Sequence, residues 1–561
     1  MRLIFKTEIK KCPDCNIALR AYRTYTRHIR SIKYGHFEAV HRLMLCRRCR
    51  KLFKSEALGN LVGKYCTYAN DVMVRVASMM SIEGESSSEV SSSIGISEGH
   101  ARKMNSQGLD IFASIHEKNI PRLRKYMKSY ILQIDGTTDS EFSMIVAVKD
   151  PTTGFVLYVK RCDSESEESI KDVLNTVKSR FGMPSGITCD MRSGIISAAG
   201  MVFPHIPIRI CLMHFLRDLG KDLMKALHTV LGLMINRRGI KSPLKKLLRS
   251  MPDYNQKTLE EVASGSCSSR KAMEIMAIRR ILENIMSIKS SGYGFPFSLR
   301  HINFFTACVE GMRKLKDLTG RLEARESIEM ASTIIKHLSA VVENTAIMEN
   351  ANKLKDLNSI IFQRLRKVFM VPDHGNLSND SYNAITDDPI VHENCTILFG
   401  ELEVYLKSDI KDHMFKAAKL SIERYSNRET MLFAQNADGT IPRTNNNMEI
   451  FFRKIRRNVR KRCGNTVTGN ILTQSGDKLA LFQNMANEKY REIVFENTDI
   501  GSVFAEYRKP FKKEGMTKKR EVELVNKGTE MIMNNSLNKD PYKEWASNKS
   551  TDFYKNIGIN G

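Results

Sequence analysis

The sequence predicts an α/β protein whose mixed sheet is interrupted by a large all-α insertion and preceded by two small amino-terminal units. Three observations predict this arrangement. Two Cys-x-x-Cys pairs lie near the amino terminus, runs rich in β-branched and aromatic residues fill residues 130–160, and strand patterns almost vanish between residues 215 and 439. Because 561 residues exceed what one hydrophobic core usually supports, several units are expected.

The composition favours a polyanionic partner. The chain has 88 Lys and Arg residues against 62 Asp and Glu residues, a formal net charge of +26. This bias is expected of a protein that lies against nucleic acid. A basic enzyme that never meets nucleic acid is the alternative.

The sequence also predicts where the protein works. No apolar run approaches the roughly 20 residues that a membrane-spanning helix requires, and the first residues do not form a signal peptide. We therefore expect no membrane partner and an intracellular, DNA-associated location, in the cytoplasm or nucleoid or in a nucleus. Twelve cysteines in such a compartment indicate metal ligands or buried thiols before disulfides.

The first unit, residues 1–66, is predicted to be a zinc ribbon. Cys12 and Cys15 form one Cys-x-x-Cys pair and Cys46 and Cys49 the other. Two such pairs complete a tetrahedral shell for one structural Zn²⁺ ion. The surrounding Lys, Arg and Tyr residues suit phosphate contacts. Free thiols, or a zinc-stapled knuckle that binds protein, are the alternatives.

The second unit, residues 67–126, is predicted to be a helix-turn-helix. Ser86 precedes Glu89 by three residues, as in a capping box, and Ser97 can cap a third helix over residues 98–107. A plain helical linker is the alternative. The third helix would present these side chains to DNA: His100, Arg102, Lys103, Asn105 and Gln107.

A mixed sheet is predicted in residues 127–215. Three short strands form an antiparallel meander, and a helix over residues 164–181 leads to a fourth strand at residues 186–189. Since strand–helix–strand crossovers are right-handed, the fourth strand can lie parallel to the first and beside it. The meander strands are residues 130–134, 142–148 and 155–160.

Asp135 and Asp190 end the first and fourth of these strands. Ligands gather at the carboxyl ends of neighbouring parallel strands, and two carboxylates so close would repel each other without a cation between them. The sequence therefore predicts a divalent metal site here. Asp139, Glu141 and Asp163 are nearby carboxylates that could replace a misassigned member.

Cys211 lies at the end of a further predicted strand, residues 206–212, and His214 lies just after it. A Cys and a His three residues apart can ligate zinc, but no second pair accompanies them. We favour structural support near the carboxylates, with a buried thiol and an imidazole that hydrogen-bonds close to them.

The carboxy-terminal half is predicted to be a helical insertion, residues 216–440, then a return to the sheet domain, residues 441–504, and a basic tail, residues 505–561, which could contact DNA or be solvated. A helix should start near Asn446, which has capping-box spacing to Glu449. We favour the other interpretation of Glu449, a third carboxylate for the metal site. The basic face of this helix would follow a DNA strand through Arg453, Arg456, Arg457 and Arg460.

Four motifs, in this order, resemble transposases with a DDE ribonuclease-H-like catalytic domain, in particular the Mutator-like group and its bacterial insertion-sequence relatives. The motifs are Ile134-Asp135-Gly136-Thr137, Thr188-Cys189-Asp190, Cys211-x-x-His214, and Thr444-Asn445-Asn446-Asn447-Met448-Glu449 before an Arg-rich helix.

The resemblance implies an RNase H-like sheet with a helical insertion before the glutamate. It implies that Asp135, Asp190 and Glu449 are a catalytic triad holding two Mg²⁺ ions, with Mn²⁺ as the alternative ion, and that Cys211 and His214 lie outside the triad. The implied activity is cleavage at transposon ends and strand transfer to target DNA, both double-stranded, by a homodimer or larger assembly. A catalytically inactive, transposase-derived DNA-binding regulator is the alternative.

Overall fold

We analysed a computed structural model of the chain, which describes residues 1–138, 144–162, 164, 166–266, 269–288, 294–371, 388–407, 412–464, 469–496, 498–508 and 518–533. The chain divides into two compact units, Met1–Phe504 and Ala505–Gly561. In the second unit the structure describes the end of α21 (Ile500–Arg508) and α22 (Lys518–Met533). Among the described residues, no helix has both the length and the apolar composition needed to cross a membrane.

The chain begins with a four-stranded mixed sheet. β3 lies between β1, which is parallel to it, and β2, which is antiparallel, and β4 pairs with β3. Ile29, Phe37 and Ala39 form its core with the following helix. The elements are β1 (Arg2–Phe5), β2 (Arg20–Ser31), β3 (Gly35–Leu45), β4 (Leu52–Phe53) and α1 (Glu56–Leu61).

Helices follow, and two of their caps are as predicted. Ser86 and Glu89 form a complete capping box before α3 (Ser87–Ile94), which ends at Gly95 with a φ of 72°. The Ser97 side chain caps α4 (Glu98–Met127). Before them lie α2 (Asn70–Ser78) and a π-helical turn, η1 (Met79–Glu83).

The predicted end of the third helix is wrong, because α4 runs for 30 residues instead of stopping at Gln107. Its second half buries Phe112, Ile115 and Leu123, and the helix contacts α5 (Glu167–Phe181), α19 (Gly469–Phe482) and α20 (Glu488–Phe495). This apolar face continues the helix into the core, so α4 belongs to both regions.

The second sheet has five strands in the order β7-β6-β5-β8-β9. β5, β6 and β7 form the predicted antiparallel meander, while β8 is parallel to β5 and β9 is parallel to β8. The crossover prediction is therefore confirmed. The strands are β5 (Ile131–Thr138), β6 (Met144–Lys149), β7 (Val156–Cys162), β8 (Gly186–Cys189) and β9 (Ile208–Ile210).

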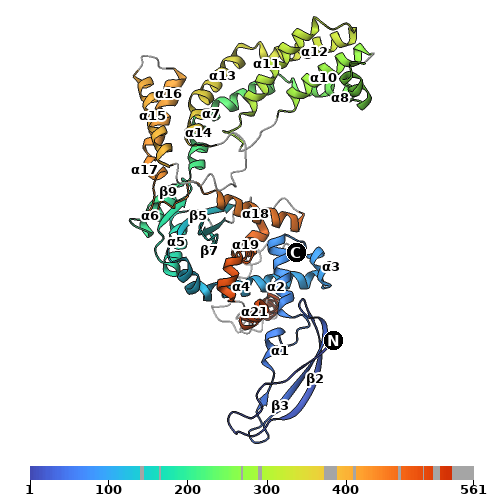
Figure 1. Cartoon of the computed structure of the whole chain (residues 1–561), viewed down its shortest axis with the longest axis vertical. Helices are drawn as coiled ribbons and strands as arrows, with labels where there is room; N and C mark the ends of the chain where they lie inside the picture. Colours follow the sequence, from blue (N-terminus) through green and yellow to red (C-terminus); the bar gives the residue numbers. More distant parts are fainter. Residues whose placement is uncertain are drawn as a thin grey trace. The chain divides into compact units, whose positions relative to one another are not determined.

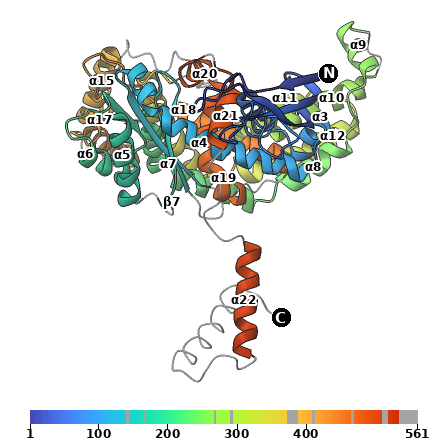
Figure 2. The ribbon, with the colours of Figure 1, turned by 90° about the horizontal axis from the view of Figure 1, so that it is seen from below.

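Helices cover both sides of this sheet. α5 (Glu167–Phe181) and α6 (Ser193–Val202) lie next to each other on one side, and α18 and α19 lie on the other (Figures 1 and 2). The Ser166 side chain caps α5, whose first turn carries Glu167 and Glu168, where the helix dipole favours acidic groups.

Between β9 and α18 the described residues form helices and no strand, as predicted. Leucine, isoleucine and phenylalanine side chains from these helices share one continuous core. The helices are α7 (Leu212–Arg237), α8 (Lys241–Ser250), α9 (Gln256–Ala263), α10 (Arg270–Met286), α11 (Arg300–Thr319), α12 (Arg325–Val342), α13 (Thr345–Asp356), the π-helical η2 (Leu357–Phe362), α14 (Gln363–Val368), α15 (Asp388–Leu406), α16 (His413–Ser426) and α17 (Glu429–Leu432).

The chain then returns to the sheet. α19 packs so closely on β6 and β7 that a Cβ atom at Gly476 would lie 2.2 Å from Cδ1 of Ile145. The returning elements are α18 (Asn446–Cys463), α19 (Gly469–Phe482), the 3-10 helix η5 (Gln483–Ala486), α20 (Glu488–Phe495) and α21.

Candidate active site

Asp135 and Asp190 lie where two parallel strands stop pairing. Asp190 directly follows β8, as predicted. The prediction that Asp135 ends the first strand is wrong. β5 continues to Thr138, because its last residues pair with β6. The parallel pairing between β5 and β8, however, stops at Gln133. Asp135 therefore lies just beyond the end of the parallel pairing, beside the loop that follows β8.

Local hydrogen bonds fix both carboxylates. The Gly136 backbone N–H donates to Oδ1 of Asp135 at 2.9 Å. The Arg192 backbone N–H donates to Oδ1 of Asp190 at 3.1 Å, and its side-chain Nε lies 3.1 Å from Oδ2. Arg192 is a site residue that the sequence interpretation missed, although its position two residues after Asp190 was a usable signal.

Residues 441–445 connect the helical insertion back to the sheet, and hydrogen bonds join them to successive strands. Thr188 Oγ1 in β8 donates to the Pro442 carbonyl at 3.3 Å. The backbone N–H of Leu212 donates to the Arg443 carbonyl at 3.0 Å. This segment therefore crosses the carboxyl ends of β8 and β9.

The same segment reaches β5 through its last two residues. Gln133 Nε2 donates to the Thr444 carbonyl at 3.3 Å, and Asn445 Nδ2 donates to the Ile134 carbonyl at 3.0 Å. The backbone N–H of Asn445 also donates to Sγ of Cys211 at 3.2 Å. The buried Cys211 thus supports the segment that starts α18, as predicted for a structural role.

A buried ion-pair network between Arg209, Asp388 and Arg443 holds residues 441–445 in place. Asp388 accepts hydrogen bonds from Arg209 Nη1 at 2.7 Å and Nη2 at 2.9 Å, and lies 3.3 Å from Nε of Arg443. Arg209 Nη1 also donates to the Ile441 carbonyl at 3.1 Å. No sequence signal links these residues, since 179 positions separate Arg209 from Asp388.

Glu449 lies in the first turn of α18 and points toward cationic groups of α7. Its Oε1 is 3.4 Å from Nη1 of Arg217 and 3.6 Å from Nε2 of His214. The alternative capping-box role with Asn446 is wrong, because the N-cap is Asn445 and it forms no side-chain cap. Arg217, three residues after His214 on the same helix, is a second residue that was missed.

The site carries opposed charges. Burial raises the pKa of Asp135 to about 7, and the negative charges of Asp190 and Glu449 add to this effect. Burial also raises the pKa of Asp190. For His214, burial lowers the pKa, but Cys211 and Glu449 outweigh it and raise the value to about 9. A charged imidazole therefore lies among three carboxylates, and the aspartates would gain from a further cation.

One group of side chains in the described part of the chain has the geometry of a metal site. Among the described residues, the four cysteines are the one set of three or more candidate ligands whose donor atoms all lie within 4.8 Å. The carboxylates of Asp135, Asp190 and Glu449 do not meet this limit. The alternative ligands Asp139, Glu141 and Asp163 lie outside the described residues.

The four cysteines form two similar turns. Cys12 accepts a backbone hydrogen bond from Asn16, and Cys46 accepts one from Arg50; both donors have a φ of 54°. Sγ of Cys12 lies 3.6 Å from Sγ of Cys49. Sulfurs that surround zinc at about 2.3 Å lie about 3.8 Å apart. The cluster could therefore bind zinc.

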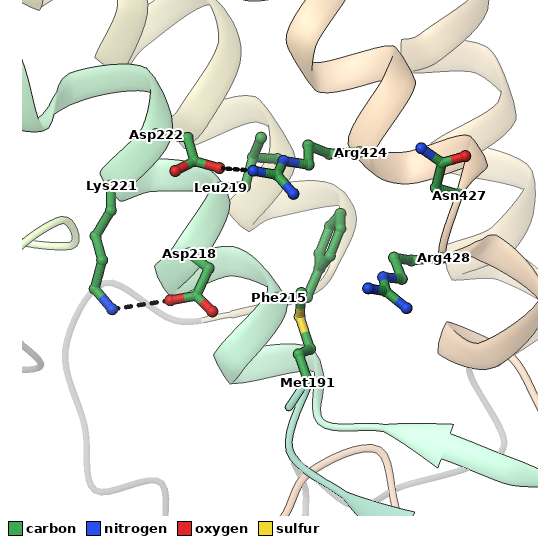
Figure 3. A pocket seen from close by; sticks show the side chains of 9 residues that line it. All are labelled: Met191, Phe215, Asp218, Leu219, Lys221, Asp222, Arg424, Asn427 and Arg428. Carbon is green, nitrogen blue, oxygen red and sulfur yellow. Dashed lines mark hydrogen bonds and ion pairs between the residues drawn. The ribbon is translucent and has the colours of Figure 1, made fainter. Parts of the chain in front are cut away.

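A cavity of about 330 Å³ lies between α7 and the α16–α17 region, and Met191, the residue after Asp190, lines it (Figure 3). Arg424 Nη2 pairs with Oδ2 of Asp222 at 2.7 Å, and Lys221 Nζ pairs with Oδ1 of Asp218 at 2.8 Å. The sequence interpretation missed this cavity, because its walls come from segments about 200 residues apart.

Some of the side chains predicted to face DNA are exposed, and one is buried. His100, Arg102 and Lys103 are exposed on α4, where Arg102 pairs with Glu98 at 2.8 Å. Asn105, by contrast, is buried and accepts a hydrogen bond from Ser81, so it cannot read bases. The helix turns Asn105 inward because it lies four residues after the buried Ala101 and four before the buried Leu109, on the same face.

The basic face of α18 is largely exposed to solvent. Arg453, Arg457 and Arg460 are exposed and Arg456 is half-buried. Asn458 on the same helix donates to the Ile82 carbonyl at 2.7 Å, which joins α18 to the π-helical turn before α3.

Comparison with known proteins adds little. No family model and no curated protein matches the chain. Among solved structures, the chain is similar to one from the "Drosophila P element transposase strand transfer complex", with 10% identity and a TM-score of 0.29. The match covers 76% of this chain and 94% of that chain. A score this low carries no weight for fold or function, so the assignment rests on the residues.

Proposed function

We propose that this protein is a DNA transposase of the DDE type, with an RNase H-like catalytic domain split by the helical insertion. The observation that carries the proposal is the path of residues 441–445. They form hydrogen bonds across β9, β8 and β5 and lead directly into α18, whose first turn carries Glu449. A segment far from the two aspartates in sequence thus carries Glu449 to the same end of the sheet, which supports its assignment as the third carboxylate of such a site.

The order of the strands supports the same proposal. The strand–strand–strand–helix–strand pattern by which the chain resembles DDE transposases folds here as β5, β6, β7, α5 and β8, with β8 beside β5. The insertion precedes the glutamate, as the resemblance implies.

Each side chain has a proposed task. Asp135, Asp190 and Glu449 would hold Mg²⁺ or Mn²⁺, since carboxylate oxygens are the ligands these ions prefer. When bound, such ions activate water or a 3′-hydroxyl and stabilise the leaving oxygen at phosphorus. Arg192 would orient Asp190, and Arg217 and His214 would hold the carboxylate of Glu449 in the first turn of α18.

The protein would bind duplex DNA through the exposed basic residues of α4 and α18. It would act as a homodimer or larger assembly, because two transposon ends must be paired. The four cysteines would hold one structural zinc ion.

One observation favours the second candidate, a DNA-binding regulator derived from a transposase. Glu449 contacts Arg217 and His214, and the ligand atoms of the three carboxylates do not all lie within 4.8 Å of one another. A regulator would keep the DNA-binding surfaces and would not cleave.

Cleavage of labelled duplexes taken from the DNA on both sides of the gene separates the two candidates. With Mg²⁺ we expect nicking that a chelator abolishes. Asp190→Asn, Asp135→Asn and Glu449→Gln should each lower the rate by at least about two orders of magnitude, since each removes several kcal/mol of transition-state stabilisation.

The matched control is Asp172→Asn, an exposed carboxylate on α5 that pairs with Lys160. It should cleave like the wild type, and all variants should bind DNA with unchanged affinity. Nicking that survives Asp190→Asn would refute the catalytic assignment. DNA binding without nicking by the wild type would favour the regulator.

A further inference from the structure

The corner between α7 and α8 concentrates positive charge without acidic neighbours in sequence. Between Asp222 and Asp253 the chain has seven Lys and Arg residues and no Asp or Glu residue. Six of these basic residues are exposed, five of them between Arg237 and Arg249, and Arg300 at the start of α11 is exposed as well. We call these five and Arg300 the corner surface: Arg237, Arg238, Lys245, Lys246, Arg249 and Arg300.

The backbone of the corner is firmly held. Ile235, Ile240 and Leu244 are buried in the core of the insertion, and Leu247 and Leu248 pack against it. The apolar face of α8 is therefore used inside the protein, which leaves its charged side chains on a rigid support and removes the apolar face that a membrane-binding helix would need.

The charges at the corner reinforce one another. Lys241 lies beneath the corner surface, with Nζ 4.9 Å from the centre of the Phe304 ring and 3.0 Å from Oδ1 of Asn236. Burial lowers its pKa, and the positive charges of Arg300 and Lys245 lower it further. Arg300 and Lys245, from different helices, thus act on one site.

Several exposed cations elsewhere on the insertion have acidic partners. Arg313 lies 3.6 Å from Asp317, Arg325 lies 2.9 Å from Glu329, and Lys271 pairs with Glu326. None of the six members of the corner surface has such an ion pair among the described residues. Clustered like charges destabilise the isolated protein, so this local excess indicates a polyanion as partner.

We propose that the corner surface binds the phosphate backbone of double-stranded DNA, as a contact separate from α4 and α18. Duplex DNA as the polyanion follows from the proposed function, whereas the argument for a polyanion does not depend on it. α8 has no aromatic residue to stack on unpaired bases, which favours a duplex over a single strand. Such a contact neutralises phosphates without reading sequence.

Salt dependence of DNA binding tests this proposal. The full chain, carrying Asp190→Asn to block cleavage, is titrated with a fluorescent 40-base-pair duplex at several salt concentrations. The triple variant Lys245→Gln, Lys246→Gln, Arg249→Gln should reduce the slope of log Kobs against log salt by about 2 to 3, because each lost phosphate contact removes about 0.9.

The matched control removes the same charge from ion-paired positions, by Lys271→Gln, Arg313→Gln and Arg325→Gln. It should change the slope by less than about 1. Equal effects of the two triples would overturn the proposal, as would an unchanged slope in the corner triple. Loss of binding to phosphatidylserine vesicles with DNA binding intact would also overturn it, in favour of a membrane.

Thermal unfolding of both triples confirms that any loss is not a loss of folding. Measuring DNA nicking by the wild type distinguishes a failure of this inference from a failure of the proposed function. A wild type that never nicks DNA but shows the slope change refutes only the catalytic proposal, and normal nicking with no slope change refutes only the corner surface.

Discussion

Single side chains at the candidate site are tuned by their neighbours. Asp135 is half-buried near other carboxylates, and its desolvation raises its pKa to about 7, while Glu449 lies against the guanidinium of Arg217. His214 connects the two, since its charge acts on both. Two carboxylates of similar intrinsic acidity are thereby placed in different electrostatic surroundings, and a cation between them would remove the difference.

Another histidine makes stability depend on pH. His116 is 2% exposed, with Nδ1 2.7 Å from the Tyr490 hydroxyl and Nε2 3.0 Å from the Leu157 carbonyl. A carbonyl only accepts, so Nε2 carries the proton, and Nδ1 accepts from the hydroxyl. Burial lowers the pKa of His116 to about 4.

We expect this neutral histidine to destabilise the fold on acidification. Its pKa is lower in the folded chain than the ordinary 6.5, so the unfolded chain binds the extra proton first. The stabilisation is complete above pH 6.5 and is lost as pH falls toward 4. Between pH 6.5 and 5 the free energy of unfolding should fall by about 2 kcal/mol through this group.

Urea unfolding at several pH values measures the effect. His116→Gln should be less stable at pH 7 and should lose this part of the pH dependence. His36→Gln, at an exposed position of β3, should behave like the wild type. Identical pH profiles for the wild type and His116→Gln would contradict the assignment.

At the scale of elements, residues 441–445 decide whether the site exists. The segment has no regular secondary structure, yet its side chains are buried. Hydrogen bonds and ion pairs connect it to β9, β8 and β5. The buried residues include Ile441, Arg443, Thr444 and Asn445. α18 begins directly after it, so the position of Glu449 follows from how this segment is held.

Removing its buried carboxylate should be costly. Asp388→Ala leaves the guanidinium of Arg209, itself 2% exposed, without its bidentate partner. We expect a loss of about 3 to 5 kcal/mol in the free energy of unfolding, measured by urea denaturation. Asp222→Ala breaks the exposed pair with Arg424 and should cost no more than about 1 kcal/mol. Equal costs would show that the network does not hold the segment.

On the scale of the whole molecule, positive charge is distributed over several separate surfaces. Exposed Lys and Arg residues on the amino-terminal sheet, on α4 and α18, and on the corner surface contribute to the net charge of +26. Long duplexes can contact several such surfaces at once, and affinity then depends steeply on salt.

The amino-terminal sheet has a small apolar core and should depend on metal. We expect one zinc per chain by elemental analysis, and a zinc chelator should unfold this sheet first, seen as new protease cleavage within residues 1–66. Cys46→Ser should lose the zinc and show the same cleavage without chelator. Cys463→Ser, an exposed cysteine outside the cluster, should retain zinc. Full zinc content in Cys46→Ser would contradict the four-cysteine site.

The sequence by itself determined the local structure. The capping box of Ser86 and Glu89, the cap at Ser97, the meander and the crossover to β8 were predicted, because caps, turns and hydrophobic periodicity act over a few residues. The two Cys-x-x-Cys pairs likewise indicated the cluster that the fold brings together.

Only the tertiary structure decided what surrounds the carboxylates. The length of α4, the burial of Asn105, the network around Asp388 and the contact of Glu449 with Arg217 all depend on segments tens to hundreds of residues apart. Periodicity reports which face of an element is apolar, but not which distant element covers it. The chemistry of the site is set by those distant contacts, because burial and charge at each carboxylate come from its neighbours in space.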